Sequence, residues 1–321
     1  MDMSPTLIRA MAPNVNDAPF PALINVPTYH AIGNAKHKAL LFIHGWGGAS
    51  RYFLDVMSDL SDTRYCLAVD LPGFGESPAL PPQDAESVNT YGELPYSHRG
   101  LARYLSQFLD KLKVTHCDVI GHSYGSGVAI ALAALFPQSV ERVVISNFST
   151  FRDERERRIV AMMHHVTGAM MLARKLPFAH ADWFARAFGA RYFHTLPKNM
   201  QILRDGLEDF MRMDDSAARL TVRDSLDWET PQDLARLTQP VLSIHCRQDQ
   251  IMPPRNAEFT AALAPQGQLA WIDGCGHLPM IERRAEWVRL VGRFLHRGDA
   301  EDTEAAKMNK EIPSANSASL R

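Results

Sequence analysis

The sequence lacks a marked excess of either charge, and this absence removes several classes of partner. Its 321 residues include 34 Lys and Arg against 36 Asp and Glu, which gives a formal net charge of −2 at pH 7. Because the two signs are interspersed along the chain, nothing in the balance indicates nucleic acid or an acidic substrate. We therefore expect the partner to be a small neutral or apolar molecule.

Cysteines and long apolar runs are also scarce. The four cysteines fall singly and none has the spacing of a metal site, so we interpret them as buried reduced thiols. The first residues do not combine a basic segment with a following apolar stretch, and no run reaches the ~18 apolar residues of a membrane span. We expect a cytoplasmic protein without stable membrane insertion.

What the sequence does contain, from about residue 39, is an alternation of short apolar runs with longer amphipathic ones. This pattern is typical of an α/β fold, a mostly parallel sheet with helices on both faces. The expected strands are 39–43, 65–69, 117–120, 140–145, 241–245 and 269–272. Such sheets bind ligands at the carboxyl ends of their strands, so the loops after these runs are the first candidates for chemistry.

Residues 147–232 interrupt the alternation. They are helical in character, hold half of the 14 methionines, and separate two runs that would otherwise be consecutive strands. We interpret them as a helical cap between the two parts of the core, 1–146 and 233–297. Its methionines and aromatic residues could line a pocket or simply form the cap's own core. Residues 298–321 are polar and small, which predicts a disordered tail.

The segment Gly121-His-Ser123-Tyr-Gly125 lies between an apolar strand and a helix of small residues that stops before Pro137. A Gly-x-Ser-x-Gly sequence in this context predicts a nucleophile elbow, a tight turn that exposes one serine in a strained conformation. The flanking glycines are needed because side chains there would clash with the neighbouring strand and helix. Ser123 is the candidate nucleophile.

A serine hydroxyl is a poor nucleophile near neutral pH, so it needs a histidine to take its proton and a carboxylate to orient that histidine. In this fold class the chain order is serine, acid, histidine. Asp249 follows the expected strand 241–245, and His277 follows 269–272. We predict a triad of Ser123, His277 and Asp249.

Other acids fit this order less well. Three of them lie in or beside the insertion rather than after a strand: Asp224, Asp227 and Asp233. Asp273 is too close to His277 in the chain to reach back to it easily. The position after strand 140–145 reads Ser146-Asn147-Phe148 and brings no carboxylate before Asp153, which favours Asp249.

Acyl transfer also builds negative charge on the carbonyl oxygen, which backbone N–H groups stabilise. One donor should be the amide of Tyr124, next to the nucleophile, and the other the amide of Trp46 in the loop His44-Gly-Trp-Gly-Gly48. We interpret His44 and His122 as structural neighbours, because the side chain beside an elbow serine points away from its hydroxyl.

Taken together, the His44 loop, Asp70-Leu-Pro-Gly-Phe-Gly-Glu-Ser77, the Ser123 elbow, the Asp249 loop and Gly276-His277 resemble the α/β-hydrolase superfamily over residues 39–297. The resemblance implies an eight-stranded sheet with a helical lid inserted after the sixth strand. It implies a hydrolase but says little about the substrate.

The serine at the elbow excludes relatives that carry aspartate there, such as epoxide hydrolases and haloalkane dehalogenases. The His-Gly-Trp-Gly-Gly loop departs from the His-Gly-Gly-Pro-Gly loop usual in proline iminopeptidases. We expect a serine hydrolase that cleaves a largely apolar carboxylic ester, with no metal and no organic cofactor. The alternatives are a C–C bond hydrolase of vinylogous diketones, a thioesterase, or a ligand receptor with slow turnover. The sequence leaves the oligomeric state open.

Overall fold

The structure of the protein is a computed structural model that describes residues 26–81, 93–159, 161–162, 171, 174, 181–252 and 254–296. The expected tail 298–321 and most of the methionine-rich stretch between 161 and 172 lie outside the described residues.

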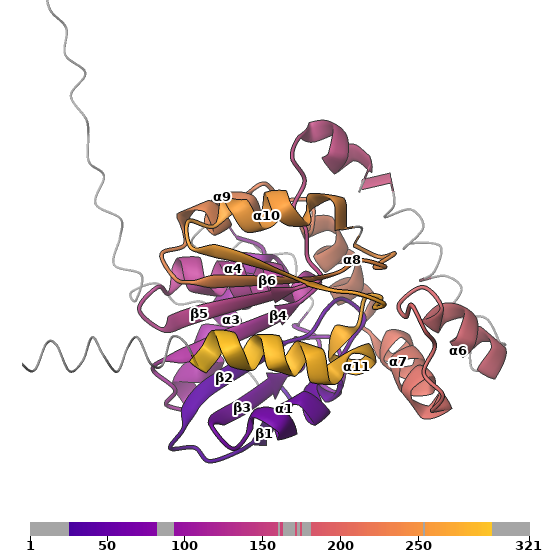
Figure 1. The fold of residues 1–321 in the computed structure, drawn as a ribbon, viewed down its shortest axis with the longest axis horizontal. Coiled ribbons are helices and arrows are strands. Elements are labelled where there is room, and N and C mark those ends of the chain that lie inside the picture. Colours follow the sequence, from indigo (N-terminus) through magenta and orange to yellow (C-terminus); the bar gives the residue numbers. More distant parts are fainter. Residues whose placement is uncertain are drawn as a thin grey trace, which may run out of the picture.

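A seven-stranded sheet forms the centre of the described molecule (Figure 1). Its strands follow the spatial order β1-β3-β2-β4-β5-β6-β7, and all neighbouring pairs are parallel except β1 with β3. The strands are β1 (Tyr29–Ile32), β2 (Lys38–Ile43), β3 (Arg64–Val69), β4 (Cys117–His122), β5 (Val140–Ser146), β6 (Val241–Cys246) and β7 (Gly267–Ile272).

The mostly parallel α/β sheet predicted from the sequence is confirmed, and each of the six expected strands is present. The described residues hold seven strands, whereas the resemblance implied eight. The additional strand that sequence reasoning missed is β1, which is short and only partly buried at the sheet edge, so it shows no apolar run. The insertion follows β5, the fifth strand of the seven.

Helices cover both faces of the sheet. On one face α1 (Leu54–Leu60) lies beside the last helix, residues 284–296, and Arg284 of that helix donates to Asp59 of α1 at 2.6 Å. The opposite face carries α3 (His98–Lys111), α4 (Tyr124–Leu135), α9 (Glu229–Arg236) and α10 (Ala257–Leu263). Because α4 packs between the sheet, α3 and α9, it is apolar around its whole circumference, as a buried helix should be.

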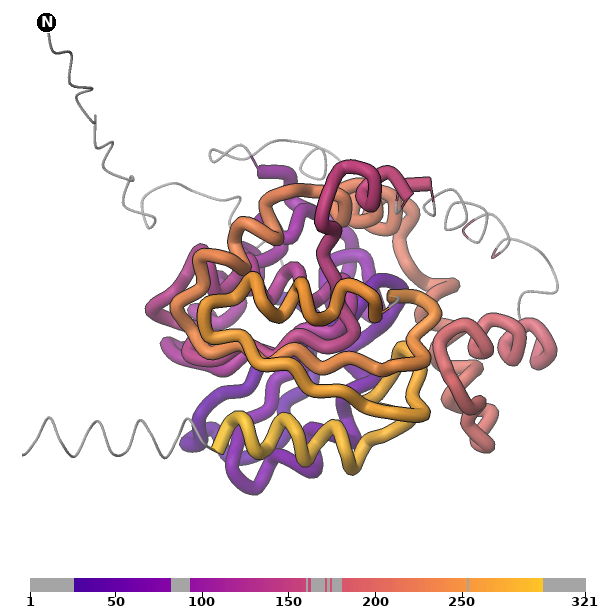
Figure 2. The backbone as a smooth tube through the Cα atoms, turned by 45° about the horizontal axis from the view of Figure 1, so that its top comes forward, coloured from indigo at the N-terminus to yellow at the C-terminus, as the bar shows by residue number. Residues whose placement is uncertain are grey.

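The described part of the insertion is helical. It contains α6 (Asp182–Gly189), α7 (Met200–Arg212), α8 (Asp215–Asp224) and the start of α9. Figures 1 and 2 show α6 and α7 together at one side of the molecule, apart from the two helical layers. Because α9 packs against α4 and α10 of the core, the expected boundary at 232/233 falls inside a core helix.

Candidate active site

Ser123 lies in the turn between β4 and α4, with φ 51° and ψ −124°. A non-glycine residue at positive φ is strained, which is typical of a nucleophile elbow. A Cβ at Gly121 would collide with the Cα of Ser126 in the helix, and one at Gly125 would collide with the carbonyl of Ile43 in β2. The flanking glycines are therefore required by close contact with the neighbouring helix and strand, as the sequence predicted.

Two loops at the carboxyl ends of β6 and β7 bring Asp249 and His277 together. His277 Nδ1 donates to Asp249 Oδ2 at 2.8 Å, and both side chains are buried. This bond leaves Nε2 of His277 as the ring's proton acceptor. The other carboxylate oxygen, Oδ1, accepts from the amides of Ile251 and Met252 at 2.8 and 3.0 Å.

Asn147, which sequence reasoning did not single out as a site residue, also holds Asp249. It directly follows β5, and its Nδ2 donates to Asp249 Oδ2 at 2.7 Å and to the Gly276 carbonyl at 3.3 Å. Burial acts to raise the pKa of Asp249, but the charge and hydrogen bond of His277 and the bond from Asn147 together hold that pKa below its usual value. The sequence signal that could have pointed to Asn147 is the absence of an acidic residue directly after β5.

The loop after β2 lies directly against Ser123. A Cβ on Gly45 would be 3.0 Å from the Cβ of Ser123. The His44 ring anchors this loop, because Nδ1 donates to the Gly45 carbonyl at 2.8 Å and Nε2 accepts from the Leu71 amide at 3.0 Å. The Trp46 indole donates to the Ala218 carbonyl of α8 at 3.1 Å.

Tyr124 directly follows Ser123 in the chain. Its hydroxyl donates to the Tyr96 carbonyl at 2.8 Å, so the side chain is held on the side of α3 and its capping turn. Tyr124 is also the first residue of α4. The first amides of a helix have no hydrogen-bond partner within it, so a free amide is expected here.

The sequence predicted that the His122 side chain points away from the Ser123 hydroxyl. In the structure the His122 ring lies beside His277. Its Nε2 donates to the His277 carbonyl at 2.7 Å, and the two rings lie 4.8 Å apart between centroids. Burial, followed by the nearby His277, lowers the pKa of His122 to about 3. His122 is therefore neutral at ordinary pH and holds the backbone of His277.

A cavity opens above Ser123, His122 and His277. The core contributes Gly45, Trp46, Gly47, Gly48, Tyr52, Leu278 and Ile281 to its lining, and the insertion contributes Phe188, Gly189, Tyr192, Phe193, Ile202, Leu203 and Gly206. The walls are thus mainly aromatic and aliphatic, and the cavity holds about 590 Å³ of unfilled space, part of it open to solvent. Among the described residues, the lining includes no methionine.

Glu282, at the end of α11 (Pro279–Glu282), connects the insertion to the loop that carries His277. Its carboxylate accepts from the amides of Gly276, His194 and Thr195 at 2.8, 3.1 and 2.6 Å. The His277 amide also donates to the Tyr192 carbonyl at 2.6 Å. The segment after α6 is therefore bonded directly to the loop that carries His277.

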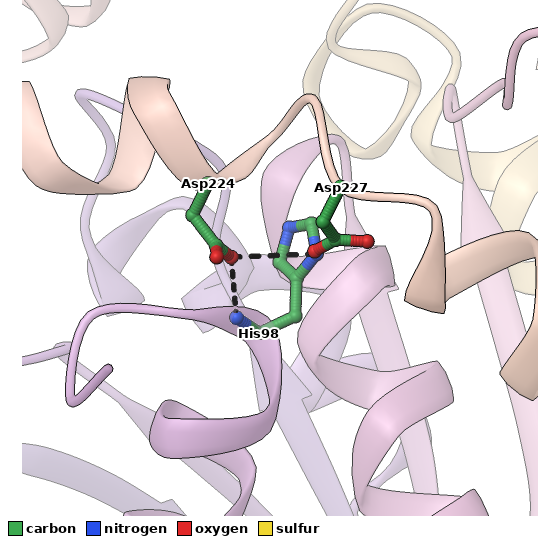
Figure 3. Close-up of side chains that lie close together, drawn as sticks. All are labelled: His98, Asp224 and Asp227. Atoms are coloured by element: carbon green, nitrogen blue, oxygen red, sulfur yellow. Dashed lines mark hydrogen bonds and ion pairs between the residues drawn. The ribbon is translucent and has the colours of Figure 1, made fainter. Parts of the chain in front are cut away.

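A second cluster of titratable groups lies behind the elbow helix. Figure 3 shows His98 between Asp224 and Asp227, and ligand atoms of the three lie within 4.8 Å of one another. Burial lowers the pKa of His98, but the bond to Asp227 and the charges of the surrounding carboxylates raise it overall. His98 packs against the Tyr124 ring at 4.5 Å, and its Nδ1 lies 2.9 Å from the Thr230 hydroxyl. His98 Nδ1, Asp224 Oδ2 and Asp227 Oδ1 take part in hydrogen bonds, whereas His98 Nε2 is buried without a partner. We interpret the cluster as a buried group of ion pairs.

Comparison with known proteins agrees with this fold. The sequence model of the alpha/beta hydrolase fold family matches residues 38–284. A putative carbamate hydrolase, RutD, of Pseudomonas savastanoi pv. phaseolicola is 27% identical over 276 residues, or 84% of this chain and 98% of that protein. A 2-hydroxymuconate semialdehyde hydrolase of Pseudomonas sp. strain CF600 is 28% identical over 283 residues, or 81% and 88%. An esterase structure from Exiguobacterium antarcticum has a TM-score of 0.68 at 16% identity, covering 84% of this chain and 94% of that one.

These findings define the class of protein: it is a hydrolase, and therefore an enzyme. The chain belongs to the α/β-hydrolase family, which confirms the resemblance seen in its motifs. In the part of the chain that the structure describes, no helix has both the length and the apolar character needed to cross a membrane.

Proposed function

We propose that the protein is a serine hydrolase that cleaves a largely apolar carboxylic ester through an acyl-enzyme. The observation that carries the proposal is the buried His277–Asp249 hydrogen bond of 2.8 Å beside the strained Ser123, with serine and histidine facing the same cavity. Ser123 is the nucleophile, His277 is the general base, and Asp249 holds the imidazole in the tautomer that leaves Nε2 free.

In the first step Oγ of Ser123 bonds to the ester carbonyl carbon while its proton passes to Nε2 of His277. The resulting oxyanion is bound by the backbone amides of Trp46 and Tyr124, from the two segments that adjoin the serine. Collapse breaks the bond to the alkoxy oxygen, which takes the proton from His277 and leaves as the alcohol. Water, deprotonated by His277, then releases the acid and restores Ser123.

The character of the cavity supports an apolar acyl compound. The lining side chains outside the triad are mostly aromatic or aliphatic, and none of those that the structure describes carries a formal charge. A charged substrate would lose its hydration in such a wall without gaining a partner, which costs several kcal/mol. The proposed reaction uses three side chains and two backbone amides of the chain, together with water.

The direct test is steady-state hydrolysis of p-nitrophenyl esters from acetyl to lauryl, beside the Ser123→Ala variant. We expect turnover with an optimum in acyl length, and a loss of several orders of magnitude without the serine hydroxyl. Equal turnover by Ser123→Ala, or none by the folded wild type, would contradict the proposal.

A second candidate is a C–C bond hydrolase, which the relative named 2-hydroxymuconate semialdehyde hydrolase favours. The same triad would act on a vinylogous diketone, whose absorbance falls as its conjugated chain is cleaved. The kcat/KM for such a compound can be compared with that for the best p-nitrophenyl ester. A ratio above one would replace the ester assignment.

A further inference from the structure

Tyr52 brings a hydroxyl group to a cavity wall that is otherwise largely aromatic and aliphatic. It belongs to the short 3-10 helix η1 (Ser50–Phe53), which follows the loop beside Ser123. A Cβ on Gly48 would lie 3.0 Å from the Tyr52 ring, and one on Gly206 of α7 would lie 3.5 Å from its hydroxyl oxygen. Since Gly206 has no side chain, the hydroxyl is left uncovered on that side.

The Tyr52 hydroxyl has an anchored acceptor behind it. Behind it lies Asp209, which is buried in α7, is 4% exposed and acts on the pKa of Tyr52. Arg51 holds that carboxylate with both arms of its guanidinium: Nε lies 2.9 Å from Oδ2 and Nη2 lies 2.8 Å from Oδ1. The pair fixes α7 against η1 and sets the carboxylate beside the phenol.

The protonation states of the two side chains decide which of them acts as hydrogen-bond donor. Burial, with the charge of Asp209 acting in the same sense, raises the pKa of Tyr52 well above its usual value, so the phenol stays protonated. An ionised Asp209 can only accept, so in a contact between the two groups the donor is the O–H of Tyr52. The lone pairs that remain on the Tyr52 oxygen can then accept a hydrogen bond from the cavity.

We propose that Tyr52 is a specificity-determining residue whose hydroxyl oxygen accepts a hydrogen bond from a hydroxyl group on the substrate, away from the reacting carbonyl. The preferred substrates are then hydroxylated esters that are otherwise apolar. The ester part of this statement rests on the proposed function, whereas the hydroxyl contact concerns binding alone.

The kinetic test compares p-nitrophenyl hexanoate with p-nitrophenyl 6-hydroxyhexanoate, and hexyl acetate with 6-hydroxyhexyl acetate, so that both sides of the ester are sampled. The assay is run at pH 8, because burial raises the pKa of Asp209 to about 6 and the carboxylate must be ionised. The quantity measured is the ratio of kcat/KM for the hydroxylated ester to that for the plain ester. In one of the two series we expect this ratio to fall about tenfold in Tyr52→Phe, the usual scale of a lost hydrogen bond.

Tyr192→Phe is the matched control, since it removes the hydroxyl of another tyrosine that lines the same cavity. We expect Tyr192→Phe to keep the wild-type ratio in both series. A ratio unchanged in Tyr52→Phe in both series, or lowered equally in the two variants, would overturn the assignment. Absence of any Ser123-dependent turnover would instead contradict the proposed function.

A binding measurement keeps the hydroxyl contact testable even in that case. Ligand-detected NMR can compare the affinities of 1-hexanol and 1,6-hexanediol for the wild type and for Tyr52→Phe. We expect the diol to lose several-fold more affinity than the alcohol on removal of the phenol oxygen. Equal changes for the two ligands would overturn the proposal whatever the enzyme hydrolyses.

Discussion

Removing the side chain of Asn147 should weaken catalysis without breaking the fold. Its Nδ2 donates a hydrogen bond of 2.7 Å to Asp249 Oδ2, the oxygen that also accepts from His277. Asn147 and Asp249 are both buried. Hydrogen bonds to a charged group contribute about 1.5–3 kcal/mol. If the triad acid depends on this bond for its position, kcat/KM should fall about tenfold to 150-fold, at 1.36 kcal/mol per factor of ten.

The choice of replacement matters because Asn147 has φ 51°, a region that asparagine and glycine tolerate better than other residues. Asn147→Gly removes the side chain and keeps this conformation accessible, whereas Asn147→Ala adds backbone strain of about 1–2 kcal/mol. We therefore expect similar losses of kcat/KM in the two variants, but a lower unfolding temperature in Asn147→Ala. Asn256→Gly, which removes another buried asparagine side chain away from the triad, is the control.

The assay is the pH dependence of kcat/KM for the best p-nitrophenyl ester. Because the bond from Asn147 helps to lower the pKa of Asp249, its loss should move the acid limb of the profile to higher pH. Full activity with an unshifted acid limb in a folded Asn147→Gly variant would refute the reasoning. So would a loss of the same size in Asn256→Gly.

Three further predictions concern the cap, the cavity and stability. Glu282→Gln keeps the shape of the side chain but weakens three charge-assisted hydrogen bonds, so kcat should fall about tenfold. The control is Glu286→Gln, on the surface, and an unchanged kcat in Glu282→Gln would contradict the prediction. Gly206→Leu fills the cavity beside Tyr52, so the optimum acyl length measured with p-nitrophenyl esters should shorten; an optimum at the wild-type length would contradict this. Since the pKa of His122 is about 3 in the fold and ~6.5 when unfolded, stability should fall as pH drops from 6.5 toward 4. Urea unfolding of His122→Gln should show a flatter dependence, and parallel curves would contradict the shift.

Much of the fold could be predicted because its signals are local. Each buried parallel strand is a short apolar run, and the elbow glycines are neighbours of the serine they serve. The candidate triad followed from strand ends and chain order, and the hydrogen bond between Asp249 and His277 agrees with that prediction. Its catalytic role stays a proposal.

What sequence reasoning missed depends on contacts between distant segments. Asn147 lies 102 residues from Asp249, and the Asn147 side chain has no local pattern that would reveal its partner. The same holds for Glu282 and for the walls that α6 and α7 give to the cavity. Strand β1 was not predicted from the sequence, because an edge strand needs little apolar surface.

The bonds from Glu282 and from the Tyr192 carbonyl have a kinetic consequence. Any outward movement of residues 192–195 of the insertion to admit a large ester would have to break the bond to the His277 amide and part of the Glu282 contacts at the same time. His277 would then keep its bonds to Asp249 and His122 but lose its bond to the insertion. If His277 is the general base, as proposed, a slow return of the insertion would limit turnover for bulky esters while leaving small ones unaffected.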